Sequence, residues 1–175
     1  MIKKEARILG LAATPRTLKR IPVIGVVYRG NLWLDGIFKC QIRRGGREPL
    51  SRLVTAIVQS KQYSQIHAVI LSRENLAPGI RIDISNFSRR INLPVLSIVK
   101  KTTLSQRGAR SKVQPLRIRI AGRLVYIRAE GVSSEEAQEI FAIACASGKR
   151  IPEAVRVAQI VAKHTTGCDP RPEGK

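Results

Sequence analysis

The chain has 175 residues, the size of one ordinary domain, and 43% of them are hydrophobic, enough to build a core. It carries 32 Lys and Arg against 12 Asp and Glu, a formal net charge of +20. These numbers exclude a disordered basic tail. They favour a polyanionic partner, because such an excess of one sign repels itself unless it is neutralised.

Nucleic acid is the favoured polyanion, because the sequence lacks the features of a membrane protein. A membrane surface is the alternative to nucleic acid, but the chain has no long apolar run and no signal-peptide pattern. We therefore expect a cytoplasmic protein without a membrane partner. The surface of a thermophilic protein would mix charges of both signs, and this chain has too few acids for that.

The first half of the chain predicts three strands and then a helix. The strands are expected at Arg7–Ala13, Ile21–Arg29 and Leu32–Ile42, and the turn between the second and third makes an antiparallel hairpin. Pro49 stands at a favourable first-turn position for a helix. The apolar residues behind it recur at helical spacing: Leu50, Leu53, Val54, Ile57 and Val58.

The middle of the chain predicts two buried strands with a helix between them. Ile66–Leu71 and Val95–Val99 are continuous apolar runs, which is typical of strands covered on both faces. A helix is expected at Ile84–Ile91, with Asp83 as its N-cap. A polar and basic loop follows, from Lys100 to Pro115.

The last part predicts a second hairpin and two helices. Leu116–Ile120 and Leu124–Arg128 are expected to pair. Ser133, three residues before a glutamate, starts a helix with a capping box, and Gly148 is expected to end it. The final helix is expected at Pro152–His164.

The order of these elements predicts an α/β protein of the ribonuclease-H-like type. That fold has a mixed sheet with an antiparallel first hairpin, flanked by helices, to which this chain adds an extra hairpin and a C-terminal helix pair. A doubly wound fold is the structural rival. We expect a single domain over residues 1–166 and a tail over 167–175.

The positive charge is clustered rather than spread evenly. No acid occurs between Ile84 and Ala129. In the predicted strand Leu116–Ile120, Arg117 and Arg119 alternate with apolar residues, so both should lie on one face. The residues expected to contact phosphates are Arg16, Lys19, Arg20, Arg43, Arg44, Arg47, Arg89, Arg90, Lys100, Lys101, Arg107, Arg110, Lys112, Arg117, Arg119 and Arg123.

The aromatic content favours one kind of nucleic acid. Aromatic residues make up only 4% of the chain, and Trp33, Phe38, Tyr126 and Phe141 lie in patterns that predict core positions. A platform for single strands needs exposed aromatic residues. Recognition of backbone and shape, as in folded or double-helical RNA, is therefore favoured.

Metal and cofactor sites are not evident. Cys40, Cys145 and Cys168 stand far apart, and His67 and His164 have no ligand partner at metal spacing, which argues against zinc. No nucleotide-binding motif or catalytic triad is present. We expect no cofactor, no metal, no catalytic residue and no small-molecule substrate.

The carboxylates also have structural interpretations. The first strand ends in Gly10-Leu-Ala-Ala-Thr14 and the buried fourth strand ends at Ser72, both without an acid. The remaining candidates for a metal site are Asp35, Glu74, Asp83 and Glu130. Asp35 is expected to shape a turn and Asp83 to cap a helix.

Three segments resemble the archaeal endonuclease dU family, whose members are related to the deoxyinosine-specific endonuclease V. They are Arg7-Ile-Leu-Gly10, Val26-Val-Tyr-Arg-Gly-Asn-Leu-Trp-Leu-Asp-Gly36 and Ile151-Pro-Glu-Ala-Val-Arg-Val-Ala-Gln-Ile-Val-Ala162. The resemblance implies a ribonuclease-H-like fold and a metal-dependent nuclease acting on damaged or deaminated DNA. It also shows departures, because the family has Gly-Ile-Asp-Asp at Gly10-Leu-Ala-Ala13 and Leu-Asp-Gly at Leu71-Ser-Arg73.

These observations lead to a main hypothesis and three rivals. The main hypothesis is a non-catalytic RNA-binding component of the ribosome, in contact with rRNA and with neighbouring ribosomal proteins. The rivals are a metal-dependent endonuclease of DNA repair, a DNA-binding accessory protein, and a subunit of another ribonucleoprotein such as a tRNA-processing complex.

Overall fold

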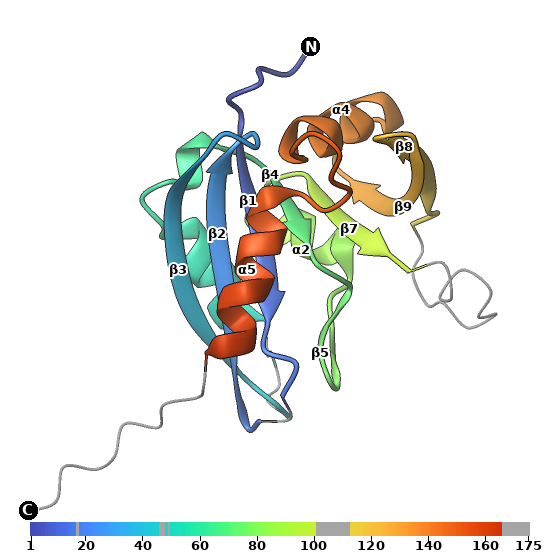
Figure 1. The fold of residues 1–175 in the computed structure, drawn as a ribbon. Coiled ribbons are helices and arrows are strands. Elements are labelled where there is room, and N and C mark those ends of the chain that lie inside the picture. Colours follow the sequence, from blue (N-terminus) through green and yellow to red (C-terminus); the bar gives the residue numbers. More distant parts are fainter. Residues whose placement is uncertain (17, 46–47, 49, 101–112, 166–175) are drawn as a thin grey trace, which may run out of the picture.

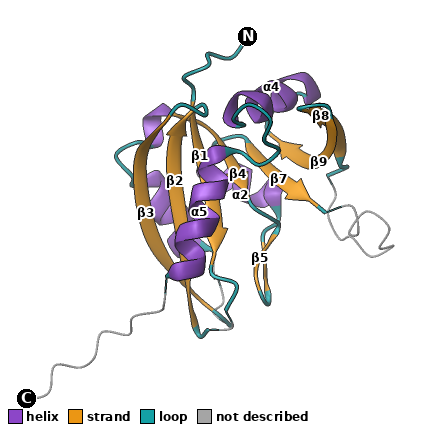
Figure 2. Cartoon of the chain, viewed as in Figure 1, coloured by secondary structure: helices purple, strands orange, loops and turns teal. Residues whose placement is uncertain are grey.

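A mixed sheet with helices on both of its faces forms the centre of the molecule (Figures 1 and 2). The computed structural model describes residues 1–16, 18–45, 48, 50–100 and 113–165. Within this part of the chain the main sheet has seven strands in the order β3-β2-β1-β4-β7-β9-β8. The expected mixed sheet with an antiparallel first hairpin is thus confirmed.

The first three strands form the antiparallel side of the sheet. They are β1 (Arg7–Ala13), β2 (Arg20–Arg29) and β3 (Trp33–Arg43), which match the predicted strands to within one residue at each end. β1 pairs with β2, and β2 pairs with β3, so β3 is an edge strand. Trp33 on this edge is 47% exposed and lies over the Arg29 guanidinium. The expectation of a core position for Trp33 is therefore wrong.

Parallel pairing brings three strand ends to one edge of the sheet. β4 (Ile66–Leu71) lies parallel to β1, and β7 (Val95–Val99) lies parallel to β4. Leu11 is in register with Leu71, which is in register with Ser97. The carboxyl ends of β1, β4 and β7 therefore share what we call the carboxyl edge of the sheet.

The second hairpin completes the sheet on the far side. β9 (Arg123–Glu130) is antiparallel to β7, and β8 (Leu116–Ile120) pairs with β9. Arg117 and Arg119 are exposed while Ile118 and Ile120 are buried, as the alternation of residues predicts.

Two short helices cover one face of the sheet. They are α1 (Ser51–Val58) and α2 (Ile84–Ile91), and a 3-10 turn at Tyr63–Gln65 leads from α1 to β4. The Asp83 carboxylate caps α2, as expected, by accepting hydrogen bonds from the amides of Ser85 and Asn86 at 3.0 and 3.2 Å.

The other face carries α4 (Ser134–Ala144) and α5 (Glu153–His164). The Ser133 capping box is present. α4 ends at Ala144 rather than near Gly148, because Cys145 is extended and forms an isolated bridge with Pro152.

A small hairpin stands apart from the main sheet and was not expected. It consists of β5 (Asn75–Ala77) and β6 (Ile80–Arg81), joined through Pro78 and Gly79. This Pro-Gly pair is the turn signal that the sequence offers for it. Among the described residues, no helix is long and apolar enough to cross a membrane.

α5 lies against β1 and β2, as Figure 1 shows, and it is held there at backbone distance. A Cβ atom on Gly10 would lie 2.3 Å from the carbonyl carbon of Ala154 and 2.5 Å from the nitrogen of Val155. Further along the helix, the buried Ala158 and Ala162 pack beside Ala12 of β1. Small residues on both elements therefore set how closely α5 approaches the sheet.

We predict that Gly10→Ala lowers the free energy of unfolding by about 3 kcal/mol, because the new methyl group meets backbone atoms and overpacks the contact. Urea denaturation followed by circular dichroism measures it, and the midpoint should fall without a change in slope.

Gly36→Ala is the matched control on β3. Its Cβ would lie 2.8 Å from Nε2 of Gln62, the far end of a flexible side chain. We expect a cost below about 1 kcal/mol. Equal losses in the two variants would contradict the importance of the α5–β1 contact.

Candidate functional site

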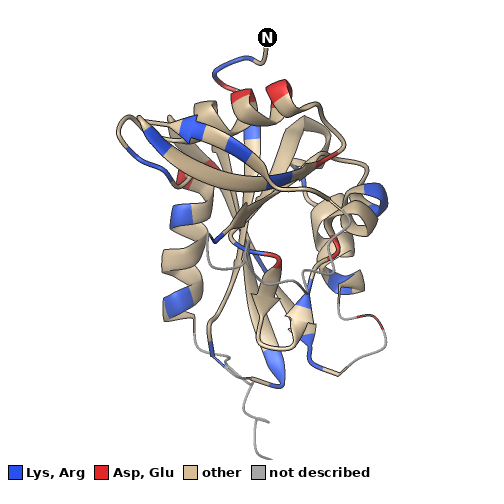
Figure 3. Ribbon diagram, turned by 90° about the vertical axis from the view of Figure 1, so that its right-hand side faces the viewer, with Lys and Arg blue, Asp and Glu red and all other residues tan. Residues whose placement is uncertain are grey.

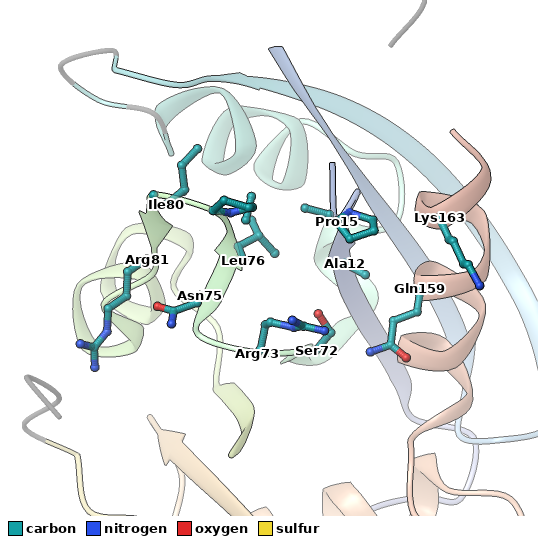
Figure 4. A pocket seen from close by; sticks show the side chains of 14 residues that line it. Ala12, Pro15, Ser72, Arg73, Asn75, Leu76, Ile80, Arg81, Gln159 and Lys163 are labelled. Carbon is teal, nitrogen blue, oxygen red and sulfur yellow. The ribbon is translucent and has the colours of Figure 1, made fainter. Parts of the chain in front are cut away.

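A cavity of about 730 Å³ opens at the carboxyl edge of the sheet (Figure 4). Ligands of open α/β sheets bind in this position, outside the carboxyl ends of the strands. The walls come from the end of β1, the segment after β4, the β5–β6 hairpin and α5. The lining residues are Ala12, Ala13, Pro15, Ser72, Arg73, Asn75, Leu76, Ala77, Pro78, Gly79, Ile80, Arg81, Gln159 and Lys163.

The segment after β4 and the helix α5 carry four of the polar side chains of the cavity, namely Ser72, Arg73, Gln159 and Lys163. The amide of Ser72 donates a hydrogen bond to the carbonyl of Leu11 at 3.0 Å, which fastens the segment after β4 to β1. In Figure 4 the Arg73 side chain extends from that segment toward α5, and the Gln159 amide points back from the helix. Lys163 lines the same cavity one turn further along α5.

The charge of the cavity is positive. Its lining includes Arg73, Arg81 and Lys163 but no Asp or Glu. Arg81 forms an ion pair with Glu74 at 3.2 Å. Arg73 and Lys163 are exposed and form no ion pair with any residue that the structure describes. Both side chains are therefore available to an anion.

Asp35 lies at the other end of β1 from the cavity. It accepts hydrogen bonds from Arg7, at the start of β1, and from Arg29, whose Nε is 3.1 Å away. Because β1 spans seven residues, Asp35 is separated from the cavity by about 20 Å at the usual rise of a strand. The hydrogen bond from Arg7 lowers the pKa of Asp35 below its ordinary value of 3.8; the bond from Arg29 adds to this, and burial opposes it.

The other candidate acids also form ion pairs or hydrogen bonds with neighbouring residues. Glu74 accepts from Nη1 of the buried Arg128 at 2.8 Å, in addition to its pair with Arg81. Glu130 accepts a hydrogen bond from the Ser85 hydroxyl at 2.9 Å. Asp83 caps α2.

These positions do not fit a divalent metal. Magnesium takes one or two carboxylates from a protein site, and the strand ends at the cavity present Ala12, Ala13 and Ser72 instead. Nowhere in the described ranges do three or more His, Cys, Asp or Glu side chains gather as metal ligands would.

Part of the predicted phosphate-contacting set does come together. Arg20 lies opposite Arg43 in the β2–β3 register, and the amide of Arg44 donates to the carbonyl of Lys19 at 2.9 Å. This joins two sequence clusters at the edge where β1 ends. The predicted residues that lie at the carboxyl edge are Arg16, Lys19, Arg20, Arg43, Arg44 and Lys100.

The rest of that set lies elsewhere. Arg89 and Arg90 lie in the last turn of α2, on the face of the sheet opposite α5, and Arg90 pairs with Glu48 at 3.3 Å. Figure 3 shows Lys and Arg along the sheet and helices, with fewer acidic residues at scattered places. Arg117, Arg119 and Arg123 are exposed on the second hairpin. Arg47, Lys101, Arg107, Arg110 and Lys112 lie outside the described residues.

A second cavity, of about 710 Å³, borders the other end of α5. Arg123, Lys149, Arg150 and Arg156 line it, together with apolar residues of β7 and β9. Arg156 is held by Glu153 at 2.6 Å. Since Arg156, Gln159 and Lys163 are spaced by three and four residues, one stripe of α5 borders both cavities.

The cavity residues Arg73, Gln159 and Lys163 were not among those expected to contact nucleic acid. One signal in the sequence could have found Arg73, which follows the buried strand where the resembling family carries Leu-Asp-Gly. Gln159 and Lys163 have no comparable signal, because only the packing of α5 on β1 brings them to the cavity.

The fold is that of the endonuclease V nucleases, a ribonuclease-H-like class. The crystal structure of human endonuclease V superposes with a TM-score of 0.62 at 16% identity, over 90% of this chain and 82% of that one. Endonuclease V of Ciona intestinalis, solved with DNA containing an inosine followed by a ribo-adenosine, gives 0.55 at 14% identity, over 87% and 82%.

The sequence identifies a family within this fold. The model of the endonuclease dU family matches residues 4–166, so the chain belongs to this family. A UPF0215 protein of Methanothermobacter thermautotrophicus is 30% identical over 184 aligned positions, which cover 94% of this chain and 90% of that protein. The resemblance noted from the three sequence segments is thereby confirmed.

Family membership corrects three expectations. The chain belongs to a family of endonucleases, so the expectation of a non-enzyme is wrong. The expectations of a ribosomal role and of rRNA and ribosomal proteins as partners are also wrong, because the nucleic acid seen with a protein of this fold is DNA. The missing carboxylates and the basic charge suggested those roles, but neither distinguishes RNA from DNA.

We predict that Asp35→Asn lowers the free energy of unfolding at pH 7 by about 1 kcal/mol, since partly exposed ion pairs contribute no more than this. The pKa of Asp35 is lower in the folded state, so the wild-type advantage is present above pH 3.8 and is lost as the pH falls through the folded-state pKa. Urea titrations at pH 7 and pH 3 measure the difference.

The same variant should leave DNA binding unchanged, because Asp35 lies at the opposite end of β1 from the cavity. A large loss of DNA affinity in folded Asp35→Asn protein would contradict this assignment of the site.

Proposed function

We propose that this protein is a DNA endonuclease of the endonuclease V type and that its substrate phosphate enters the cavity at the carboxyl edge. The observation that supports this most directly is that Arg73 and Lys163, which line this cavity, form no ion pair with any other described residue. Family membership supports nuclease chemistry.

DNA with a deaminated base is the substrate class that we propose. A protein of the same fold is complexed with DNA that contains an inosine. The surface of this chain suits such a polyanion, because Arg16, Lys19, Arg20, Arg43 and Lys100 lie exposed along the same edge as the cavity. Basic side chains in this position would bind the backbone on either side of the reacting phosphate.

The side chains of the cavity suit a reacting phosphodiester. In hydrolysis a water molecule attacks the phosphorus, the bond from phosphorus to one deoxyribose oxygen breaks, and the proton lost by the water reaches the leaving oxygen through solvent. The Arg73 fork and the Lys163 ammonium would offset the negative charge that builds on the phosphate oxygens during this step. The Ser72 hydroxyl and the Gln159 amide can hold the phosphate or a water molecule by hydrogen bonds. The four candidate acids named above are held by arginines, by a serine and by a helix cap, so none of them is free to hold a metal ion at the cavity.

The test is a nicking assay on end-labelled duplexes that contain one deoxyinosine or one deoxyuridine, beside an undamaged duplex of the same sequence. We expect one strand to be cut near the altered base, and Arg73→Gln to lower the single-turnover rate by at least about tenfold. The assay is run with magnesium, with manganese and with EDTA.

Lys61→Gln is the matched control, because it removes one exposed charge beyond α1, near the start of β4 at the other edge of the sheet. It should cut at the wild-type rate. Failure of the wild-type protein to nick any of the duplexes under all three conditions would overturn the proposed function.

A further inference from the structure

We infer that the cavity at the carboxyl edge binds a DNA phosphate directly through Arg73 and Lys163, without a divalent cation between them. This rests on the proposed function in taking DNA as the ligand. It goes further, because it assigns the phosphate-binding role to two side chains of this chain and removes the metal from the binding step.

The strand ends that line the cavity supply no carboxylate that would attract a cation. β1 ends at the cavity with Ala12 and Ala13, and the segment after β4 begins with Ser72 and Arg73. Arg73 and Lys163 both line the cavity, and their positive charges would repel a cation placed there. An anion placed there would meet only favourable charge.

The nearest acid does not neutralise this site. Glu74 directly follows Arg73 in the chain, but its carboxylate is held at 2.8 Å by Arg128 and at 3.2 Å by Arg81. The Arg128 side chain is only 5% exposed, so this pair is sheltered from solvent screening. Two arginines thus share one carboxylate, and the Arg73 charge remains uncompensated.

The cavity has the size and the donors for a nucleotide. Its volume of about 730 Å³ falls within the usual range for small-ligand sites. The Arg73 fork can donate two parallel hydrogen bonds to a phosphate, which a lysine cannot do. Gln159 adds an amide group that points from α5 toward Ser72 and Arg73, as Figure 4 shows.

The walls are fixed by contacts that do not involve a ligand. The Ser72 amide is bonded to the Leu11 carbonyl, and α5 touches β1 at backbone distance beside Gly10. Arg73 lies directly after the Ser72 amide that is bonded to β1, and Lys163 lies in the last turn of α5, so both side chains start from backbone that is tied to the sheet.

Fluorescence anisotropy of a labelled short DNA duplex tests the inference. Titrations are run in EDTA and in magnesium at matched ionic strength, and we expect dissociation constants that agree within about twofold once the salt effect is matched. Arg73→Gln and Lys163→Gln should each weaken binding in EDTA by about tenfold and reduce the salt slope by about one.

Lys61→Gln, which loses the same charge at the other edge of the sheet, should bind as the wild type does. A second pair of variants adds charge instead of removing it. Ser72→Asp places a carboxylate beside Arg73 and should weaken binding in EDTA by about tenfold, since one phosphate contact is offset. Ser64→Asp, an exposed site in the turn before β4, should change little.

Three results would overturn the inference. They are binding that disappears in EDTA and returns with magnesium, Arg73→Gln and Lys163→Gln variants that bind like Lys61→Gln, and a Ser72→Asp variant that binds like Ser64→Asp. Because anisotropy in EDTA measures binding alone, these results are distinct from a failure of the nicking assay, which tests the proposed function.

Discussion

The contact between α5 and β1 is the constraint on which the rest of the site depends. Gly10 lets the helix backbone reach the strand, and Ala158 and Ala162 continue the close approach beside Ala12. Because both elements are rigid, this contact sets where Gln159 and Lys163 lie relative to the segment after β4. The cavity is the space left between α5 and the β5–β6 hairpin at the edge where β1 and β4 end. A bulky residue at this contact would displace α5, and the displacement would change both the shape of the cavity and the position of the Lys163 charge in it.

Pairing of charges decides what the cavity can bind. Two acids near the sheet form ion pairs with arginines: Asp35 with Arg7 and Arg29, and Glu74 with Arg81 and Arg128. The chain has a net charge of +20, and among its described residues Arg73 and Lys163 form no ion pair and line the cavity. The family fold suggests a place for metal ions there, whereas the described side chains make that place attractive to an anion. A phosphodiester fits both observations, because it is the substrate of nucleases and it is an anion that a positively charged cavity attracts.

Much of the fold was predictable because its signals are local. Apolar runs marked β4 and β7, alternation marked β8, and Ser133 and Asp83 marked helix starts, all patterns that depend on residues a few positions apart. The site was less predictable. The sequence shows the missing acids at Ala12 and Ser72, which suggest loss of catalysis, and the basic clusters, which suggest rRNA. Charge identifies a polyanion without distinguishing its kind, since DNA and RNA share the same phosphates.

By itself the sequence determined the order of the elements, the strong positive charge, the absence of acids at two strand ends, and the family. Only the tertiary structure decided that Asp35 lies at the far end of β1, that Glu74 is shared by two arginines, and that Arg73, Gln159 and Lys163 surround one cavity. The physical reason is distance along the chain. Arg73 and Lys163 are brought together by parallel pairing of β1 with β4 and by the packing of α5, and such long-range contacts leave no periodic pattern in either segment.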